Sequence, residues 1–295
     1  MGAVGEESVL RRLAALAGNS DIFDIDAAGP DGIVINIDGY AASASRLPFM
    51  SWEDWGYKAV MAAASDVIAA GGRPVGIAYS VGASSVDLLE RVAAGVGEAS
   101  RDLGAKVYKG DANRLTSDAW IDVAVVGLSG RQVGRSGAKP GDMVVQVGLL
   151  GYGALANKVM RSELRADSLP QDLLLKVRRP RAHVEAAEAI STYAHASSDN
   201  SDGWLLTLSN IASSSSVKIS IEEVVIDPKL EGLVRPEEAL GSWEDYNLAV
   251  VVPQDHLKEF MKTCGSTCFT VGRVEEGRGV EFKGKKVEPR GWSWW

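Results

Sequence analysis

Six aspartates stand beside small or turn-forming residues, where a loop can carry a short carboxylate into a cleft. They are Asp26, Asp38, Asp66, Asp111, Asp199 and Asp202. Each one taken singly is typical of a helix cap or a turn. If several converged, their mutual repulsion would require cations, and a ligand set made only of oxygens selects Mg²⁺ or Mn²⁺. The aspartates therefore predict a divalent-metal site, provided that the fold brings them together.

Other catalytic patterns are absent from the sequence. It contains no G-x-x-x-x-G-K-[ST] phosphate loop, no G-x-S-x-G nucleophile elbow and no H-E-x-x-H zinc helix. The glycine run at 148–153 resembles a dinucleotide motif only loosely, and we interpret it as a strand-to-helix turn. With three scattered histidines and two cysteines, a zinc site is not expected. Cys264 and Cys268 are interpreted as two small, partly buried thiols, with a local bridge as the alternative.

Length and charge exclude several classes of protein. The chain has 295 residues, which suits two domains with separate cores. Its 31 basic and 39 acidic residues give a formal net charge of −8, so we expect no nucleic-acid partner. No apolar run approaches the length of a membrane span, and the first residues lack the layout of a signal peptide. We therefore expect a cytoplasmic protein with no membrane partner.

Helices and strands alternate in the first half of the chain. Apolar periodicity and glycine stops predict helices over 6–17, 52–70 and 86–103. Apolar and β-branched runs predict strands over 33–37, 75–81, 106–109 and 121–128. Asp38 and Asp111 would lie at the ends of two of these strands.

A turn-rich polar stretch over 135–142 is the best boundary between domains. It divides the chain into residues 1–137 and residues 138–295. In the second part, strands are expected over 143–147, 217–225, 248–252 and 268–274, and helices over 154–160 and 182–194. Residues 197–216 read as a polar loop that leads into a helix N-terminus. Because both parts mix strands and helices, the class is α+β or α/β.

The order of the motifs resembles that of the thiamine-monophosphate kinase family. Residues 65–74 read Ser-Asp-Val-Ile-Ala-Ala-Gly-Gly-Arg-Pro, similar to the family's Ser-Asp-Leu-Ala-Ala-Met-Gly-x-x-Pro. Further matching segments follow in the family's order at 110–111, 134–142, 148–151, 179–181, 199–203, 243–248, 271–274 and 291–292. The resemblance spans nearly the whole chain, and such colinearity is far more specific than any single motif.

The resemblance implies a two-domain α+β fold of the aminoimidazole-ribonucleotide-synthetase-like superfamily. In that fold the N-terminal domain dimerises through a sheet, and the C-terminal domain is a separate α+β unit. A homodimer is therefore expected, with ATP in a cleft near the dimer interface and several Mg²⁺ ions between its phosphates and the aspartates.

The resemblance also assigns roles to single residues. The metal ligands would be Asp26, Asp38, Asp66, Asp111, Asp199 and Asp202. Gly110, Asp111 and Ser201 would contact ATP, and Arg135 would neutralise its phosphates. Glu244 and Trp292 would face the thiamine end of the substrate. Direct in-line transfer to a phosphate acceptor needs alignment and charge compensation rather than a covalent intermediate, so Asp111 and Arg135 are the expected catalytic residues.

Several positions depart from the family pattern. Ile25 stands where the family has the first of two adjacent aspartates, although Asp24 would replace it after a small shift of register. Ile37 replaces a threonine, and Lys109 adds a positive charge beside the expected metals. The family's His-Phe pair is missing, and Arg46 in that region either contacts a phosphate or lies on the surface.

These observations leave three hypotheses. The leading one is ATP-dependent phosphorylation of thiamine monophosphate to the diphosphate. A second keeps the ATP chemistry but changes the phosphorylated acceptor, as in other enzymes of the superfamily. The third, which the departures from the family pattern keep open, is an inert ATP-binding regulatory paralogue.

Overall fold

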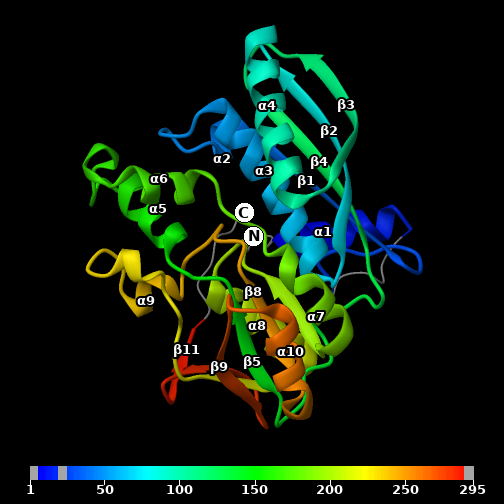
Figure 1. Cartoon of the computed structure of the whole chain (residues 1–295), viewed down its shortest axis with the longest axis vertical. Helices are drawn as coiled ribbons and strands as arrows, with labels where there is room; N and C mark the ends of the chain where they lie inside the picture. Colours follow the sequence, from blue (N-terminus) through cyan, green and yellow to red (C-terminus); the bar gives the residue numbers. More distant parts are fainter. Residues whose placement is uncertain (1–5, 19–24, 289–295) are drawn as a thin grey trace.

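Two mixed β-sheets form the framework of the chain (Figure 1). The computed structural model describes residues 6–18 and 25–288. The first sheet has the order β1-β4-β2-β3. Its strands are β1 (Ile33–Ala41), β2 (Arg73–Ala83), β3 (Lys106–Arg114) and β4 (Trp120–Leu128). Only β2 and β3 pair in parallel within this sheet.

The second sheet has the order β11-β10-β7-β9-β5-β8-β6. Its strands are β5 (Met143–Val147), β6 (Ala196–Asp199), β7 (Lys218–Ile221), β8 (Leu248–Val252), β9 (Cys268–Glu275), β10 (Gly279–Phe282) and β11 (Lys285–Val287). All of its pairs are antiparallel except β7 with β10. Mixed sheets with helices packed against them confirm the predicted α+β class.

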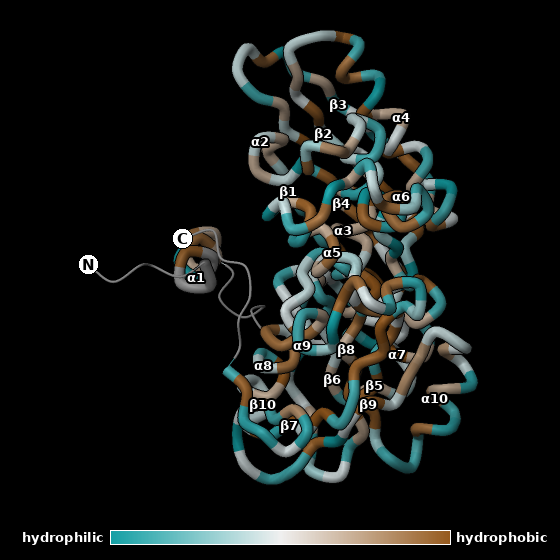
Figure 2. The backbone as a smooth tube through the Cα atoms, turned by 90° about the vertical axis from the view of Figure 1, so that its left-hand side faces the viewer, coloured by the Kyte–Doolittle hydropathy of each residue, from teal (hydrophilic) through white to brown (hydrophobic). Residues whose placement is uncertain are grey.

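Helices cover these sheets unequally. They are α1 (Glu6–Leu16), α2 (Ala42–Ser45), α3 (Trp52–Ala69), α4 (Val86–Leu103), α5 (Tyr152–Met160), α6 (Gln171–Arg178), α7 (Ala187–Tyr193), α8 (Trp204–Ser215), α9 (Pro236–Ala239) and α10 (Leu257–Cys264). In the second sheet, alternate residues of β8 join two different core clusters, one with α7 and α10 and one with α8. Strands buried on both faces explain the continuous apolar runs of β5 and β8. Figure 2 shows α1 standing apart from both sheets.

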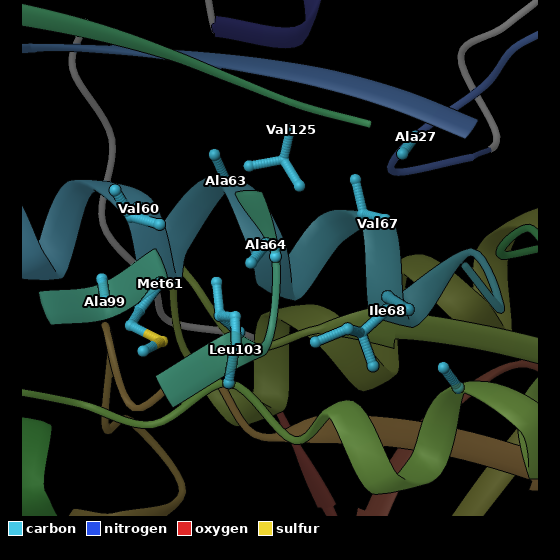
Figure 3. Close-up of a cluster of buried hydrophobic side chains, with 14 of the residues drawn as sticks. Ala27, Val60, Met61, Ala63, Ala64, Val67, Ile68, Ala99, Leu103 and Val125 are labelled. Atoms are coloured by element: carbon cyan, nitrogen blue, oxygen red, sulfur yellow. The ribbon is translucent and has the colours of Figure 1, made fainter. Parts of the chain in front are cut away.

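Helix α3 is the shared centre of the molecule. It begins with a capping box between Ser51 and Asp54, and 15 of its 18 residues are buried. Figure 3 shows Ala63 and Val67 of α3 pointing toward Val125 of the first sheet. The same core cluster continues into α7 and into β5 and β8 of the second sheet. Two core clusters are present, but the first includes residues from both halves of the chain, because a helix rich in alanine lets both layers pack closely against it.

The predicted elements are confirmed where the apolar pattern is long. Helices α3 and α4 and strands β5 and β8 match their expected ranges within one residue. Strands β1 and β3 are longer than expected, so Asp38 and Asp111 lie inside strands and not at their ends. The cause is backbone pairing, which continues to Ala41 opposite Trp120 and to Arg114 opposite Ala83.

Other boundaries in the second half are also corrected. The helix expected over 182–194 is a 3-10 turn followed by α7, because His183 has a non-helical backbone with ψ of 66°. The strand expected over 217–225 ends at Ile221, where its pairing with Gly272 stops. The polar segment 197–216 begins inside strand β6 and contains the whole of α8. Helices α6 and α10 were not predicted.

The two cysteines form a disulfide, so their interpretation as thiols is wrong. Cys264 closes α10 and Cys268 opens β9, with a Cα–Cα distance of 6.3 Å. The turn between these elements holds the two residues at a bridging distance. No helix in the described part of the chain has both the length and the apolar character needed to cross a bilayer.

The contact between α3 and α4 generates a stability prediction. A Cβ on Gly95 would overlap the carbonyl oxygen of Glu53, whereas one on Gly97 would meet Arg101 Nη1 at an ordinary 3.6 Å. We expect Gly95→Ala to lower the free energy of unfolding by about 1–3 kcal/mol through overpacking. Gly97→Ala in the same helix is the matched control, and it should raise stability by up to about 1 kcal/mol. Denaturant unfolding of both variants checks this, and equal effects would contradict the close helix contact.

Candidate metal and phosphate site

Three of the predicted metal ligands meet between the two sheets. Asp26 precedes β1, Asp66 lies in the last turn of α3, and Asp199 is the last residue of β6. One carboxylate oxygen from each lies within 4.8 Å of the others. We call Asp26, Asp66 and Asp199 the carboxylate cluster. Residues far apart in the sequence thus converge where α3 contacts both layers.

Asp26 is the most fully bonded member of the carboxylate cluster. Its side chain is 1% exposed and accepts from Arg135 through Nε at 2.8 Å and Nη2 at 2.6 Å. It also accepts from Ser198 Oγ at 3.2 Å and from the backbone N–H of Asp199 at 3.0 Å. The carboxylate of Asp26 in turn holds the pKa of Arg135 above its usual value. Arg135 therefore brings one fixed positive charge to the cluster.

Neutral donors hold the other two carboxylates. Asn36 Nδ2 donates to Asp66 Oδ2 at 2.6 Å, and Ser65 Oγ donates to Asp199 Oδ2 at 2.7 Å. Burial, and then the charges of neighbouring aspartates, raise the pKa of both Asp66 and Asp199 well above the usual range. The hydrogen bonds orient these carboxylates but do not compensate their charge.

Strand β1 adds Asp38 to the same region. Asn36, Asp38 and Tyr40 alternate along the inner face of β1, and Asp38 is hydrogen-bonded to Asn36, Tyr40 and Asp66. Burial raises the pKa of Asp38 to about 6, although these hydrogen bonds oppose the rise. Because β1 continues past Asp38, its carboxylate reaches Asp66 of the carboxylate cluster from the middle of a strand.

The donor set fits a hard divalent cation. Four buried or half-buried carboxylates face one guanidinium, so their ionised forms lack sufficient compensation within the described residues. All the available ligand atoms are carboxylate oxygens, which Mg²⁺ and Mn²⁺ prefer. A bound cation would supply the missing positive charge and would lower these raised pKa values.

Asp202 and Ser201 lie close to the carboxylate cluster, in the turn between β6 and α8. The charge of Asp202 contributes to the raised pKa of Asp199. The carbonyl of Ser201 accepts from the backbone N–H of Glu244 at 2.7 Å. This turn therefore joins the carboxylate cluster to the segment that carries Glu244.

Gly110 and Asp111 lie elsewhere in this chain, on the exposed edge strand β3. The Asp111 carboxylate accepts from Ser80 Oγ at 3.4 Å and from Asn113 Nδ2 at 3.3 Å. Among the described residues, Asp111 does not belong to the group of carboxylates whose oxygens lie within 4.8 Å of one another. A Cβ on Gly110 would press on the ring of Tyr79.

The predicted substrate residues have different surroundings. Arg46 stacks over the ring of Trp52 at 4.6 Å and donates to the carbonyl oxygen of Met50. Glu244 forms an ion pair with Lys58, whose Nζ lies 2.5 Å from Oε2. Trp292 lies outside the described residues, as does Asp24.

Two of the departures from the family pattern face away from the carboxylate cluster. Ile37 is 67% exposed on the outer face of β1, because alternation turns it opposite to Asp38. Lys109 lies on the exposed strand β3 beside Gly110. Ile25 is half-buried and packs against the core next to Asp26.

Sequence reasoning missed several polar partners of the site. Asn36 and Tyr40 share the face of β1 with Asp38, and a polar residue two positions away in a β-branched run was the available signal. Ser65 and Lys58 of α3 are buried polar residues in an alanine-rich helix, which is unusual without a partner.

The glycine run at 148–153 is confirmed as a strand-to-helix turn between β5 and α5. The buried carboxylate of Asp245 accepts from the backbone N–H of Gly151 at 2.9 Å and of Gly153 at 2.6 Å. Ser242 Oγ accepts from the N–H of Ala154 at 2.9 Å. Protein groups thus occupy the helix N-terminus that a dinucleotide phosphate would need.

The raised carboxylate pKa values predict an unusual dependence of stability on pH. The pKa of Asp38 is about 6 in the folded chain against an ordinary value of 3.8, so folding takes up protons between these two values. The melting temperature of the metal-free protein should therefore fall from pH 5 to pH 7.5. Carboxylates with lowered pKa, such as Glu53 at about 2, lose their contribution only below about pH 4.5, outside this window.

Magnesium provides the matched measurement. At pH 7.5 we expect Mg²⁺ to raise the melting temperature, because it binds only the folded arrangement of carboxylates. Asp38→Asn should flatten the pH dependence, whereas the surface variant Asp172→Asn should leave it unchanged. Calorimetry checks both, and a melting temperature that rises from pH 5 to pH 7.5 without metal would contradict the assignment.

Comparisons with known proteins agree with this architecture. The family model for the AIR synthase related protein N-terminal domain matches residues 19–129, and that for the C-terminal domain matches residues 139–285. A thiamine-monophosphate kinase of Pyrococcus abyssi is 36% identical over 248 residues, which cover 81% of this chain and 77% of the relative. One of Aquifex aeolicus is 35% identical over 251 residues, covering 81% and 80%.

A solved structure has the same fold over nearly the full length. AaThiL complexed with AMPPCP and TMP superposes with a TM-score of 0.88 at 30% sequence identity, covering 99% of this chain and 97% of that chain. The matched domains, the relatives and the shared fold lead to one conclusion: the chain belongs to the thiamine-monophosphate kinase family, built from the N- and C-terminal domains of AIR synthase related proteins.

Proposed function

We propose that this chain transfers the γ-phosphoryl group of ATP to thiamine monophosphate, giving thiamine diphosphate. The observation that carries the proposal is the carboxylate cluster, which both halves of the chain build and which lacks enough positive charge of its own. Relatives that share this fold are named thiamine-monophosphate kinases, and one was solved with AMPPCP, an ATP analogue, and TMP.

The aspartates would hold the metal ions. The proposed ligands at and beside the carboxylate cluster are Asp26, Asp38, Asp66, Asp199 and Asp202. Asp111 is also proposed as a ligand, and it lies outside that group on the exposed strand β3. Mg²⁺, when bound, would neutralise phosphate charge and so let two phosphorylated reactants approach each other. The chain's own contribution is to fix the carboxylates in place through Asn36, Ser65 and Ser198.

Arg135 would compensate charge on the transferred group. A guanidinium has five N–H donors, and Arg135 uses Nε and Nη2 on Asp26. The same contact orients the guanidinium, so its remaining donors are proposed to meet phosphate oxygens. Gly110, Asp111 and Ser201 are proposed to contact ATP. Because the acceptor is itself a phosphate, no residue is assigned as a general base.

The acceptor's ring end is proposed to contact Glu244 and Trp292, and Arg46 is also proposed to contact the acceptor. The backbone N–H of Glu244 donates to the carbonyl of Ser201 in the turn that follows Asp199. The ring end of the acceptor would therefore lie near the carboxylate cluster. We also propose that the chain divides into residues 1–137 and 138–295. We further propose a cytoplasmic location, since the proposed reaction uses ATP and Mg²⁺.

A homodimer is proposed from the outer face of the first sheet. Helices α3 and α4 lie on its inner face, whereas exposed apolar side chains line the other. These are Ile35, Ile37, Tyr108 and Leu128. A second copy would bury this face, and we propose that Asp111, on strand β3 of the same sheet, lies next to this interface.

A steady-state assay tests the proposed reaction. Formation of ADP from Mg-ATP should depend on thiamine monophosphate, and Asp66→Asn should lower kcat at least about 100-fold, because the cluster loses a charge that aligns the reactants. Asp167→Asn is the control, since that carboxylate is exposed and its ion pair is with Arg165, outside the carboxylate cluster.

The other two hypotheses give different results in the same assay. Hydrolysis of ATP that ignores thiamine monophosphate but increases with another phosphorylated compound would indicate a different acceptor. Binding of Mg-ATP without turnover across a panel of phosphorylated compounds would indicate an inert regulatory paralogue.

The proposed dimer has its own test. Ile37→Lys puts a charge in the middle of the apolar sheet face and should convert a dimer to a monomer in size-exclusion chromatography with light scattering. Leu175→Lys on α6 is the control, because it changes another exposed apolar side chain, one that is 46% exposed and lies outside this face. A wild-type protein that is monomeric at micromolar concentration would refute the dimer.

A further inference from the structure

Lys58 of α3 is a buried cation to which neither the family pattern nor the proposed mechanism assigns a role. Its side chain is 4% exposed, and Nζ lies 2.5 Å from Glu244 Oε2 and 3.2 Å from the carbonyl oxygen of Ser45. The Glu244 side chain is 20% exposed. Burying an ammonium costs several kcal/mol of desolvation, so such a pair persists only when its geometry is well satisfied. Lys58 therefore holds Glu244 firmly.

The segment that carries Glu244 has an unusual backbone. Glu244 and Tyr246 both adopt left-handed conformations, with φ of 55° and 51°. Their N–H groups donate to the carbonyls of Ser201 at 2.7 Å and Asn200 at 3.1 Å. Left-handed backbone costs free energy in residues other than glycine and clusters at functional sites. The fold thus holds Glu244 from two sides, by its backbone from the turn after β6 and by its carboxylate from α3.

Helix α3 also carries partners of the carboxylate cluster. Ser65 and Asp66 lie seven and eight positions after Lys58, which places the three on one face of the helix. At 1.5 Å per residue, Lys58 and Asp66 are separated by about 12 Å along the helix axis. One rigid, buried helix therefore sets the spacing between the carboxylate of Glu244 and the carboxylate cluster.

We infer that Lys58 is a positioning residue that holds Glu244 at a set distance from the carboxylate cluster and thereby selects acceptors whose ring end and phosphate span that distance. The inference rests on the proposed function, because it names what determines the acceptor at that same site. Lys58 acts through Glu244 and does not itself touch the acceptor. Its loss should weaken binding of thiamine monophosphate and should leave binding of Mg-ATP unchanged.

Kinetics of three variants test the inference. In Lys58→Met we expect the KM for thiamine monophosphate to rise about tenfold, the lower end of the effect of removing a residue that orients a ligand side chain. The KM for Mg-ATP should stay within about twofold. Glu244→Gln should raise the KM for thiamine monophosphate as well, and the double variant should match Glu244→Gln alone, because Lys58 then has no carboxylate to hold.

Lys158→Met is the matched control. Lys158 also pairs with a carboxylate, Glu238 at 3.1 Å, and donates to a backbone carbonyl, that of Leu233 at 2.8 Å, but it links α5 to α9 away from the carboxylate cluster. We expect it to change the melting temperature without changing either KM. If Lys58→Met does not fold, the inference is tested by comparing Glu244→Gln with the double variant. Removal of both charges leaves no buried charge without a partner.

Two results would overturn the inference. One is an unchanged KM for thiamine monophosphate in Lys58→Met. The other is a double variant with a clearly higher KM than Glu244→Gln, which would mean that Lys58 acts by another route. Failure of the proposed function looks different, because the wild-type protein would then show no turnover of thiamine monophosphate at all.

Discussion

The burial of like charges between the two sheets is the constraint on which the rest of the structure depends. Asp26, Asp66 and Asp199 bring carboxylate oxygens within 4.8 Å of one another, and Asp38 adds a further carboxyl group. Desolvation and repulsion both oppose their ionisation. The fold offsets part of this cost with Arg135 and with neutral donors, and the raised pKa values show that the remainder is not compensated. A group of carboxylates that could hold a cation is thus a consequence of how the chain folds.

Such a cluster requires that the two halves of the chain keep a constant relative position. Helix α3 provides this, because its small side chains let both sheets pack onto one buried helix. A second tie lies at its first turn, where Arg179, just after α6, donates to Asp54 at 2.6 Å and pairs with Glu98 of α4. Polar links at both ends of α3 therefore fix this helix against the elements around it.

Long apolar patterns made part of this fold predictable, as α4 and β8 illustrate, because burial on one helix face or on both strand faces leaves a clear periodicity. The prediction that a strand ends just before Asp38 was wrong. In the sequence, the polar residues of β1 that face the carboxylate cluster resemble the residues that follow a strand. The convergence of Asp26, Asp66 and Asp199 depends on strand order, which periodicity does not encode, and only the order of motifs anticipated it.

The orientation of single side chains also bears on whether the site is intact. Ile37 and Lys109 differ from the family pattern, yet alternation turns Ile37 to the outer face of β1, and Lys109 lies on the edge strand β3. Asp26 accepts from Arg135 and Asp66 accepts from Asn36 of β1. The hydrogen bonds that hold Asp26, Asp66 and Asp199 therefore agree with a chain that binds a divalent metal, and turnover is what separates the kinase from an inert paralogue.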